Sequence, residues 1–282
     1  MNFNKKRINL AQVTELKNLL RQAGLHTVCE GARCPNIGEC FEKKIATFLI
    51  AGDTCTRKCR FCAVGKGKPQ PLDNDEPRRV AATIKQLGLK YAVITSVTRD
   101  DLPDGGAGHF AETVKQIRET APGVTVEILV PDFGGDEVSS QHAIASKPDV
   151  FSHNLETVPR LYTAARSGAD YRRSLALLEL AKKELPLVKS GLMLGLGETE
   201  EEVLAVMKDL RSINCDILTL GQYLAPSLKH YPVQEHLPLE RFARYEQLAK
   251  EMGFKFCASG PYVRSSYQAD AALRFIDKTI RL

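Results

Sequence analysis

Residues 47–62 read TFLIAGDTCTRKCRFC, in which an apolar run is followed at once by Cys55, Cys59 and Cys62. The apolar run is typical of a strand that is buried on both faces, as in a parallel sheet covered by helices. Reactive groups gather at the carboxyl ends of such strands, so we expect the three thiols there. Closely spaced cysteines in a chain of this size more often bind metal or take part in catalysis than form structural disulfides.

The same strand character returns six times downstream, with helical periodicity between the strands. The expected strands are YAVITS from Tyr91, TVEILV from Thr125, DVFSHN from Asp149, VKSGLML from Val188, DILTLGQ from Asp216 and FKFCAS from Phe254. The expected helices are an amphipathic one from Leu10 to Leu20, those over 75–87, 108–120, 171–184, 200–213 and 239–252, and a short closing one through Leu273 and Ile276. This alternation predicts an α/β fold with a parallel sheet, either doubly wound or closed as a barrel.

Polar loops follow four of the expected strands and would form a ring around one end of the sheet. They are CTRKCRFC after the first strand, TSVTRDD after the second, HNLET after the fourth and GLGET after the fifth. Such a ring is what the mouth of a barrel would look like. We expect three parts: an N-terminal helix and cysteine-rich loop over 1–45, a central barrel over 46–258, and a C-terminal loop and helix over 259–282.

The composition is that of an ordinary globular protein, with 43% hydrophobic and 26% charged residues in a chain of 282. No segment approaches the roughly 18 to 20 uninterrupted apolar residues that span a bilayer, and the N-terminus lacks the apolar stretch of a secretory signal. The net charge of +5 comes without a basic stripe interleaved with aromatic residues. We therefore expect a soluble cytoplasmic protein that binds neither nucleic acid nor membrane, while a modestly basic face would suit an acidic protein partner.

Another trio of cysteines, the first along the chain, consists of Cys29, Cys34 and Cys40 in CEGARCPNIGEC. Structural zinc takes four ligands, and His26 together with this trio is one way to complete such a site. Iron–sulfur clusters are the favoured interpretation, because thiolates in short loops are their usual ligands. Three thiolates leave one iron of a cubane open, and an open iron can hold a substrate directly.

The spacing Cys55-x3-Cys59-x2-Cys62, with Phe61 before the last cysteine and a buried strand ahead of it, resembles the signature of the radical S-adenosylmethionine superfamily. The first trio, together with RSSY at 264–267, narrows the resemblance to the lipoyl synthase family. The resemblance covers roughly residues 24–270 and includes EGARCPNIGEC, SVTRDDLPDGGAGHF, HNLET and YRRSL. It implies an α/β fold of the partial or full parallel β/α barrel type, with N-terminal and C-terminal extensions.

The resemblance also implies two [4Fe-4S] clusters and S-adenosylmethionine as cofactors. We call the cluster on Cys55, Cys59 and Cys62 the first cluster and the other one the second cluster. In the superfamily the open iron of the first cluster chelates S-adenosylmethionine, and one electron then releases a 5′-deoxyadenosyl radical. Family members insert two sulfur atoms, at C6 and C8, into an octanoyl chain, using two S-adenosylmethionine molecules and sulfur from the second cluster. These carbons are unactivated, so a radical carried by a cofactor must remove the hydrogen.

For the second cluster, the family's fourth ligand is the serine before the tyrosine of RSSY, which falls on Ser266. It would complete the set formed by Cys29, Cys34 and Cys40. Oxygen is a poor match for the soft ligands of such clusters. We therefore expect a site weak enough for one iron to leave and expose a sulfide. Without the resemblance, Ser266 would be interpreted as a cap of the closing helix.

Contacts to S-adenosylmethionine are assigned to polar residues at strand ends. Ser96, Asn154 and Glu156 would bind its ribose or methionyl end, and Arg166 its carboxylate, with ordinary loop structure as the alternative for each. The sequence GLG at 195–197 lacks the third glycine of a dinucleotide fingerprint. We interpret it as a tight turn that lets the backbone approach the adenosine.

The family's partners would be octanoylated lipoyl carrier domains, such as the acyltransferase subunit of a dehydrogenase complex or the glycine cleavage H protein. An electron donor such as flavodoxin or ferredoxin and an iron–sulfur carrier protein would complete the set. Two other functions remain open: a sulfur-inserting enzyme that acts on a free small molecule, as biotin synthase does, and a non-catalytic two-cluster electron carrier or iron sensor. A carrier needs fully ligated clusters, whereas Cys215 and Cys257 lie in apolar strands and are expected in the core. His153 is expected to be a satisfied histidine at a strand end.

Overall fold

The computed structural model describes residues 10–31, 36, 39–40 and 46–265 of the chain. Within them, an eight-stranded sheet has the order β1-β2-β5-β6-β7-β8-β9-β10, and a separate pair joins β3 to β4. The strands are β1 (His26–Thr27), β2 (Thr47–Ile50), β3 (Thr54–Cys55), β4 (Gly65–Lys66), β5 (Tyr91–Ser96), β6 (Thr125–Leu129), β7 (Val150–Ser152), β8 (Val188–Leu194), β9 (Ile217–Gln222) and β10 (Phe256–Gly260). Neighbours in the large sheet are parallel, except that β1 runs antiparallel to β2.

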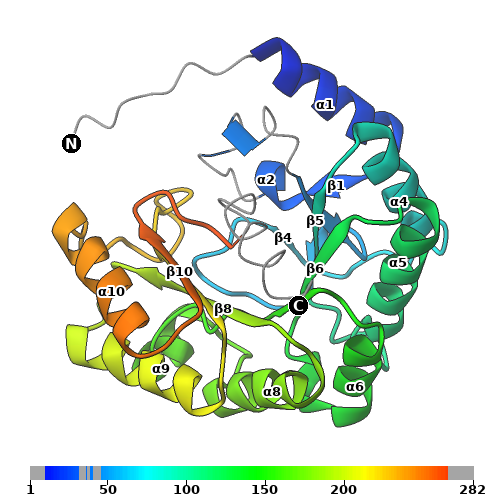
Figure 1. The fold of residues 1–282 in the computed structure, drawn as a ribbon. Helices are drawn as coiled ribbons and strands as arrows, with labels where there is room; N and C mark the ends of the chain where they lie inside the picture. Colours follow the sequence, from blue (N-terminus) through cyan, green and yellow to red (C-terminus); the bar gives the residue numbers. More distant parts are fainter. Residues whose placement is uncertain (1–9, 32–35, 37–38, 41–45, 266–282) are drawn as a thin grey trace.

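Helices connect the strands and form an outer wall around the curved sheet, as Figure 1 shows. They are α1 (Leu10–Gln22), α2 (Val28–Gly31), α4 (Glu76–Leu87), α5 (Ala107–Thr120), α6 (Glu137–Ala145), α7 (Tyr162–Ala165), α8 (Tyr171–Glu184), α9 (Glu200–Ser212) and α10 (Leu239–Glu251), with 3-10 turns η1 (Phe133–Gly135) and η2 (Pro159–Leu161). In the described residues β1 and β10 end the sheet without pairing to each other. The fold is therefore an open parallel β/α barrel, which decides between the two architectures that alternation left open.

Burial on both faces explains why the strands are continuous apolar runs. Every residue of β2 and of β9 is buried, because helices cover the outer face while side chains fill the lumen. The helices are amphipathic and capped as the sequence indicates. At the start of α9, Thr199 Oγ1 accepts from the N–H of Glu202, and the Glu202 carboxylate accepts from the N–H of Thr199.

The strands and helices expected within the described residues are confirmed, whereas shorter elements were missed. The missed elements are β1, β3, β4, α2, α6 and α7. Helix α6 is the longest of them, and its sequence EVSSQHAIA has little apolar periodicity. Its one clear signal is Asp136, whose carboxylate accepts from the N–H of Ser139 as an N-cap. The closing helix expected through Leu273 and Ile276 lies outside the described residues.

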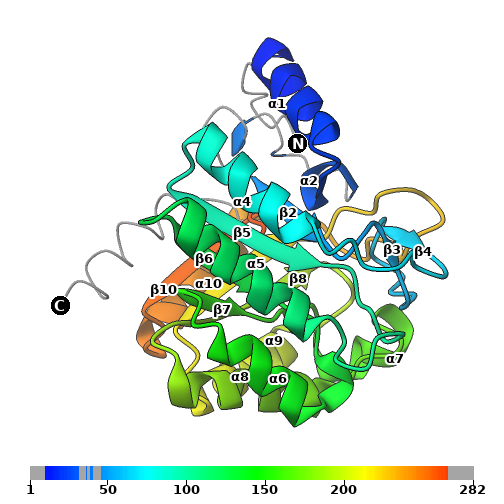
Figure 2. The ribbon, with the colours of Figure 1, turned by 90° about the vertical axis from the view of Figure 1, so that its right-hand side faces the viewer.

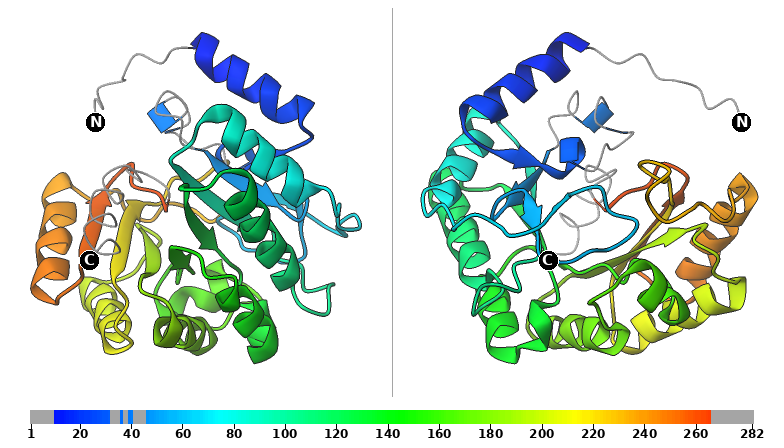
Figure 3. Two further views of the ribbon diagram at one scale, coloured as in Figure 1. Left: turned by 45° about the vertical axis from the view of Figure 1, so that its right-hand side comes forward. Right: turned by 180° about the vertical axis from the view of Figure 1, so that it is seen from behind.

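The parallel order brings the carboxyl ends of the strands to one end of the barrel. The β3–β4 pair and α7 lie at that end in Figure 2, and Figure 3 shows from two further sides that the long helices stay outside and the strands of the large sheet inside. In the described part of the chain, no helix combines the length and apolar character needed to cross a membrane. The boundaries of the three parts, at 45/46 and 258/259, remain predictions.

Candidate functional site

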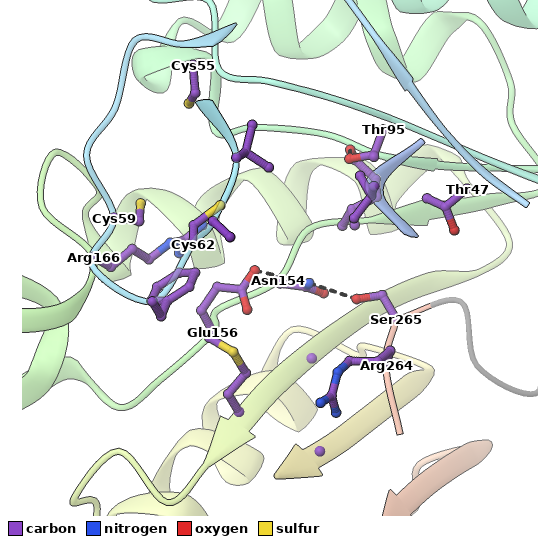
Figure 4. A pocket seen from close by; sticks show the side chains of 18 of the residues that line it. Thr47, Cys55, Cys59, Cys62, Thr95, Asn154, Glu156, Arg166, Arg264 and Ser265 are labelled. Carbon is purple, nitrogen blue, oxygen red and sulfur yellow. Dashed lines mark hydrogen bonds between the residues drawn. The ribbon is translucent and has the colours of Figure 1, made fainter. Parts of the chain in front are cut away.

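The three downstream cysteines lie on a loop that closes on itself after β2. Strands β3 and β4 pair at its base, the N–H of Gly67 donates to the carbonyl of Cys55 (3.1 Å), and Lys66 Nζ donates to that of Cys59 (2.9 Å). Cys55, Cys59 and Cys62 all line one cavity of about 550 Å³ (Figure 4). The loop therefore presents its three thiols to a common space at the barrel mouth.

Arg57, between the first two cysteines, ties this loop to the barrel. Its guanidinium donates two hydrogen bonds to Asp100 (2.9 and 2.8 Å) and lies 2.6 Å from Oδ1 of Asp132. The second oxygen of the fully buried Asp132 lies 2.8 Å from Arg173. Burial alone would raise the pKa of Asp132, but the hydrogen bond and charge of Arg57 lower it to about 2. The pair is therefore ionised at neutral pH and fixes the loop.

Backbone contacts hold the loop on its other sides. The N–H of Thr56 donates to the carbonyl of Thr98 after β5 (3.1 Å), and that of Arg60 donates to the carbonyl of Ala165 at the end of α7 (2.9 Å). The N–H of Tyr231 donates to the carbonyl of Arg60 (2.9 Å), and the Arg60 guanidinium lies over the Tyr231 ring at 5.2 Å. The cysteine loop and the segment between β9 and α10 thus form one continuous rim.

The thiols of Cys59 and Cys62 are largely neutral without a metal. Burial raises the pKa of Cys59 to about 11, against the opposing charge of Arg166, and burial also raises the pKa of Cys62. A bound metal must therefore displace their protons, which makes metal affinity depend on pH. Among the described residues, no three His, Cys, Asp or Glu side chains converge as ligands of a single ion do. A cubane cluster instead takes one thiolate on each iron.

The four side chains predicted to contact S-adenosylmethionine all line the same cavity. Ser96 ends β5, Asn154 and Glu156 follow β7, and Arg166 follows α7. Two of their atoms, Ser96 Oγ and Asn154 Oδ1, are buried and have no hydrogen-bond partner in the described part of the chain. Buried polar atoms are normally satisfied, so this pair marks where a polar ligand completes the bonding. The donor set therefore fits a polar cofactor beside the thiols.

Glu156 is held in an uncommon backbone conformation, with φ at 67° in the left-handed region. Its N–H donates to the carbonyl of Gly191 (3.0 Å), and its own carbonyl accepts from the N–H of Met193 (2.8 Å). Burial raises the pKa of the Glu156 carboxyl, while Arg166 opposes the shift. Strained residues of this kind persist where the surroundings determine them fully, as at ligand sites.

Arg166 is buried, and its described hydrogen-bond partners carry no negative charge. Its Nη1 donates to the hydroxyl of Tyr162 (2.9 Å) and to Oγ of Ser174 (3.3 Å). The guanidinium therefore remains suited to an anionic ligand.

Both ring nitrogens of His153 have hydrogen-bond partners, as expected. Nδ1 lies 2.8 Å from the Val130 carbonyl and Nε2 lies 3.0 Å from Ser174 Oγ. Burial and then the charge of Arg166 lower its pKa to about 3, so the ring is neutral.

The C-terminal segment also reaches into the cavity, where residues 263–265 form part of its lining. Asn154 Nδ2 donates to Ser265 Oγ at 2.9 Å and to Glu156 Oε1 at 3.2 Å, and Figure 4 draws both bonds. On the open side of the barrel, Asn36 Nδ2 donates to the carbonyl of Tyr262 at 2.6 Å, which joins segments 226 residues apart. The loop of the first cysteine trio and the C-terminal segment therefore meet.

The first trio is described only in part. Cys29 lies in α2 and Cys40 is buried, while Val28 of α2 lines the cavity. Cys34, the side chain of Cys29 and the predicted ligand Ser266 lie outside the described residues. The ligation of a cluster by Cys29, Cys34, Cys40 and Ser266 therefore stays a prediction.

Sequence reasoning missed Arg57 and Asp132 as residues that shape the site. Arg57 lies inside the cysteine motif CTRKCRFC. Asp132 follows β6, a strand after which the sequence analysis expected no polar loop.

The turn at 195–197 is confirmed by positive φ at Gly195 and Gly197. These residues do not line the cavity, and a Cβ on Gly195 would collide with the carbonyl of Glu235. The neighbour of Gly195 is the chain's own backbone, and the approach of this turn to adenosine stays a prediction.

The expectation for the two remaining cysteines is confirmed. Cys215 and Cys257 are both buried in the barrel core, and burial raises the pKa of each to about 12. Thiols of this kind are inert, because the thiolate is the reactive and metal-binding form.

Comparisons with known proteins agree on the family. The model described as "Radical SAM superfamily" matches residues 49–210. The chain is 57% identical to a lipoyl synthase of Caldanaerobacter subterraneus subsp. tengcongensis over 95% of each chain. It is 55% identical to that of Caldicellulosiruptor saccharolyticus (94% of this chain, 93% of the relative) and 57% identical to that of Geobacter metallireducens (94% of each).

Solved structures resemble the fold at low sequence identity. HydG, a maturase of the [FeFe]-hydrogenase, matches with a TM-score of 0.62 at 13% identity, covering 95% of this chain and 69% of HydG. Methylornithine synthase (PylB) matches with a TM-score of 0.57 at 15% identity, covering 94% of this chain and 92% of that enzyme. At these identities the likeness concerns the fold alone.

Proposed function

This chain belongs to the lipoyl synthase family, within the radical S-adenosylmethionine superfamily, and we propose how its residues divide the work of that enzyme. Its activity is lipoyl synthesis. We infer that the substrate is an octanoyl chain in amide linkage on a lysine of a carrier domain, with sulfur inserted at C6 and C8. The observation that carries this assignment is one cavity that holds three thiols, two orphaned polar atoms and an apolar wall.

Cys55, Cys59 and Cys62 would hold the first [4Fe-4S] cluster, and its open iron would bind S-adenosylmethionine. When bound, these groups supply a radical that removes hydrogen from an unactivated carbon, and a second cluster supplies sulfur. The chain's own contribution is to fix the thiol loop through Arg57, whose charge is balanced by Asp100 and Asp132. Because the loop is held at several points, the reacting groups keep fixed positions relative to one another.

Four side chains would hold S-adenosylmethionine at the strand ends. The carboxylate of the cofactor would bind Arg166, whose described hydrogen-bond partners are neutral. Its amino group suits the Glu156 carboxylate, and hydroxyl or amine groups suit the orphaned oxygens of Ser96 and Asn154. This assignment rests on donor chemistry and on a shared cavity.

The second cluster would be held by Cys29, Cys34, Cys40 and Ser266. Its support is the bond of Asn36, which lies between Cys34 and Cys40, to the carbonyl of Tyr262. That bond brings the chain before Ser266 close to the cysteine loop. A hydroxyl oxygen is a poor ligand beside thiolates, so this position would give up iron most readily.

The apolar wall suits the octanoyl chain. It includes Val28, Leu49, Val93, Leu129 and Met193. Hydrocarbon is favoured on such a surface, because its burial removes apolar area from water. The volume of about 550 Å³ lies within the range of cofactor and ligand sites.

The cavity rim suits a protein-bound substrate. Lys58 and Lys68 on the cysteine loop and Lys229 before α10 are exposed. The rim therefore carries positive charge toward an acidic face of a carrier domain, such as an acyltransferase subunit of a dehydrogenase complex or the glycine cleavage H protein. We expect Lys229→Glu to raise KM for an octanoylated carrier domain while leaving turnover of a short octanoyl-lysine peptide unchanged. Flavodoxin or ferredoxin as reductant and an iron–sulfur carrier protein complete the proposed partners.

The decisive experiment is incubation of the anaerobically reconstituted enzyme with reductant, S-adenosylmethionine and an octanoylated carrier peptide. The expected product has the mass gain of two sulfurs. Thiolation of a free small molecule without that gain would favour the rival sulfur-inserting enzyme. Cluster reduction without any S-adenosylmethionine cleavage would favour the electron carrier.

Iron content separates the two trios. Two cubanes predict about eight irons per chain, and the Cys55→Ala, Cys59→Ala, Cys62→Ala variant should keep about half. Ser266→Ala should still cleave S-adenosylmethionine but form no lipoyl product. Normal lipoyl formation by that variant would remove Ser266 from the ligand set.

A further inference from the structure

A charged pair lies inside the barrel, below the cavity described above. Lys189 Nζ of β8 is 3.0 Å from both carboxylate oxygens of Glu127 in β6, and both side chains are almost fully buried. Tyr91 OH and Ser152 Oγ also donate to this carboxylate, the latter at 2.7 Å. Buried charges persist only when paired and hydrogen-bonded in this way. None of these four residues lines the cavity, so the mechanism above does not use them.

Lys189 has one contact outside the barrel strands. An ammonium group has three donors, and Glu127 receives two of them. The third goes to the backbone carbonyl of Ser265, 76 residues away in the C-terminal segment. The ion pair with Glu127 orients the Lys189 ammonium group. The Ser265 carbonyl therefore accepts from a donor whose position the barrel strands already fix.

Two further contacts hold the same segment in the lumen. Asn154 donates to Ser265 Oγ at 2.9 Å. The backbone of Val263 passes so close to Gly221 of β9 that a Cβ on Gly221 would collide with the Val263 carbonyl. Gly221 is thus a glycine because the C-terminal segment lies against it. Gly260, its partner in β10, would meet only an ordinary contact with the Val263 side chain at 3.5 Å.

We propose that Lys189, held by Glu127, is a positioning residue that seats residues 263–265 in the barrel lumen and so fixes where the following residue, Ser266, enters the site. The part about Ser266 rests on the proposed function. We call the contact of Lys189 and Glu127 with residues 263–265 the seat. It rests on contacts of the described residues, and it can be tested without measuring any activity. Because its ion pair belongs to β6 and β8, the seat is part of the barrel and independent of the segment that it receives.

Trypsin provides the test, because it cleaves after Arg264 and a protease needs several residues of extended chain. Residues 263–265 must leave the lumen first, so cleavage reports the fraction of unseated segment. Trypsin also cleaves after Arg274, Lys278 and Arg281. The rate of release of peptides that begin at Ser265 would therefore be followed by mass spectrometry, on the anaerobic holoenzyme and on the metal-free chain. Lys189→Met removes the charged hydrogen bond and should speed release roughly tenfold or more.

The matched control is Lys182→Met. Lys182 Nζ also bonds a buried carboxylate, Asp216, at 2.7 Å, but it makes no described contact with the C-terminal segment. Gly221→Ala is a second test variant that leaves the ion pair intact, and it should also speed release. Gly260→Ala is its control and should behave as the wild type. Far-UV circular dichroism of each variant would confirm that the barrel is folded.

Faster release in both test variants, with both controls unchanged, supports the seat. Unchanged release in either test variant overturns it. In the holoenzyme, Lys189→Met should keep S-adenosylmethionine cleavage while losing lipoyl formation and part of the iron of the first trio. Full iron and normal lipoyl formation despite faster release would overturn the positioning role alone. Failure of the wild type to form lipoyl product would count against the proposed function, while the trypsin comparison would still decide the seat.

Discussion

Asp132→Asn should destabilise the protein by an amount that the structure allows to be worked out. Asp132 is fully buried between Arg57 of the cysteine loop and Arg173 of α8, at 2.6 and 2.8 Å. The depression of its pKa from 3.8 to about 2 corresponds to about 2.5 kcal/mol of stability at neutral pH, since each pKa unit is worth about 1.4 kcal/mol. Asparagine keeps the shape of the side chain but removes this charge.

The assay is urea unfolding of the metal-free chain, followed by circular dichroism. With a slope of about 3 kcal/mol per M, the midpoint at pH 7 should fall by about 0.8 M. The folded-state pKa is depressed, so the stabilisation is fully present above the ordinary carboxyl value and is lost as pH falls through about 2. The gap between wild type and variant should therefore shrink below about pH 4. Asp75→Asn, which removes an exposed partner of Arg78, is the control and should shift the midpoint little.

Two results would refute this reasoning. One is a midpoint at pH 7 within about 0.2 M of the wild type, which would mean that burial cancels the benefit of the charge. The other is a gap of the same size at pH 7 and pH 3, which would assign the loss to packing. In the holoenzyme, Arg57 would keep Asp100 as its charged partner but lose that of Asp132, so the cysteine loop should lose iron faster during dialysis against a chelator.

Three smaller changes test other parts of the fold and site. Thr199→Ala removes the capping box with Glu202 and should lower the free energy of unfolding by about 1 kcal/mol, measured in urea. Gly195→Ala places a Cβ at φ 94° against the carbonyl of Glu235, and we expect a clearly lower melting temperature than for the wild type. Glu156→Gln removes one charge from the proposed cofactor site and should weaken S-adenosylmethionine binding roughly tenfold by calorimetry; unchanged affinity would exclude a charged contact there.

The strands and long helices could be predicted because their causes are local. A run such as YAVITS is apolar on both faces wherever it lies in the chain, and Thr199 caps a helix through a residue three positions away. The cysteine spacing likewise carries its meaning within eight residues, from Cys55 to Cys62. The placement of Ser96, Asn154 and Glu156 around one cavity followed from the rule that parallel strands end at the same edge.

Other features depend on contacts between distant residues, which no local pattern encodes. Asp132 follows a strand like several others, and only folding places its carboxylate against Arg57 in the cysteine loop. A lysine within an apolar strand, such as Lys189, could have faced solvent or the lumen.

Sequence by itself therefore determined the longer strands and helices, the α/β class with a parallel sheet and the thiol motif, since these arise from neighbours along the chain. Tertiary structure alone decided that, in the part of the chain that the structure describes, β1 and β10 end the sheet without pairing to each other. It also decided that Lys189 receives a segment 76 residues away. Both features depend on contacts between residues that are far apart in the sequence. Such contacts form only when the curved sheet brings these residues together.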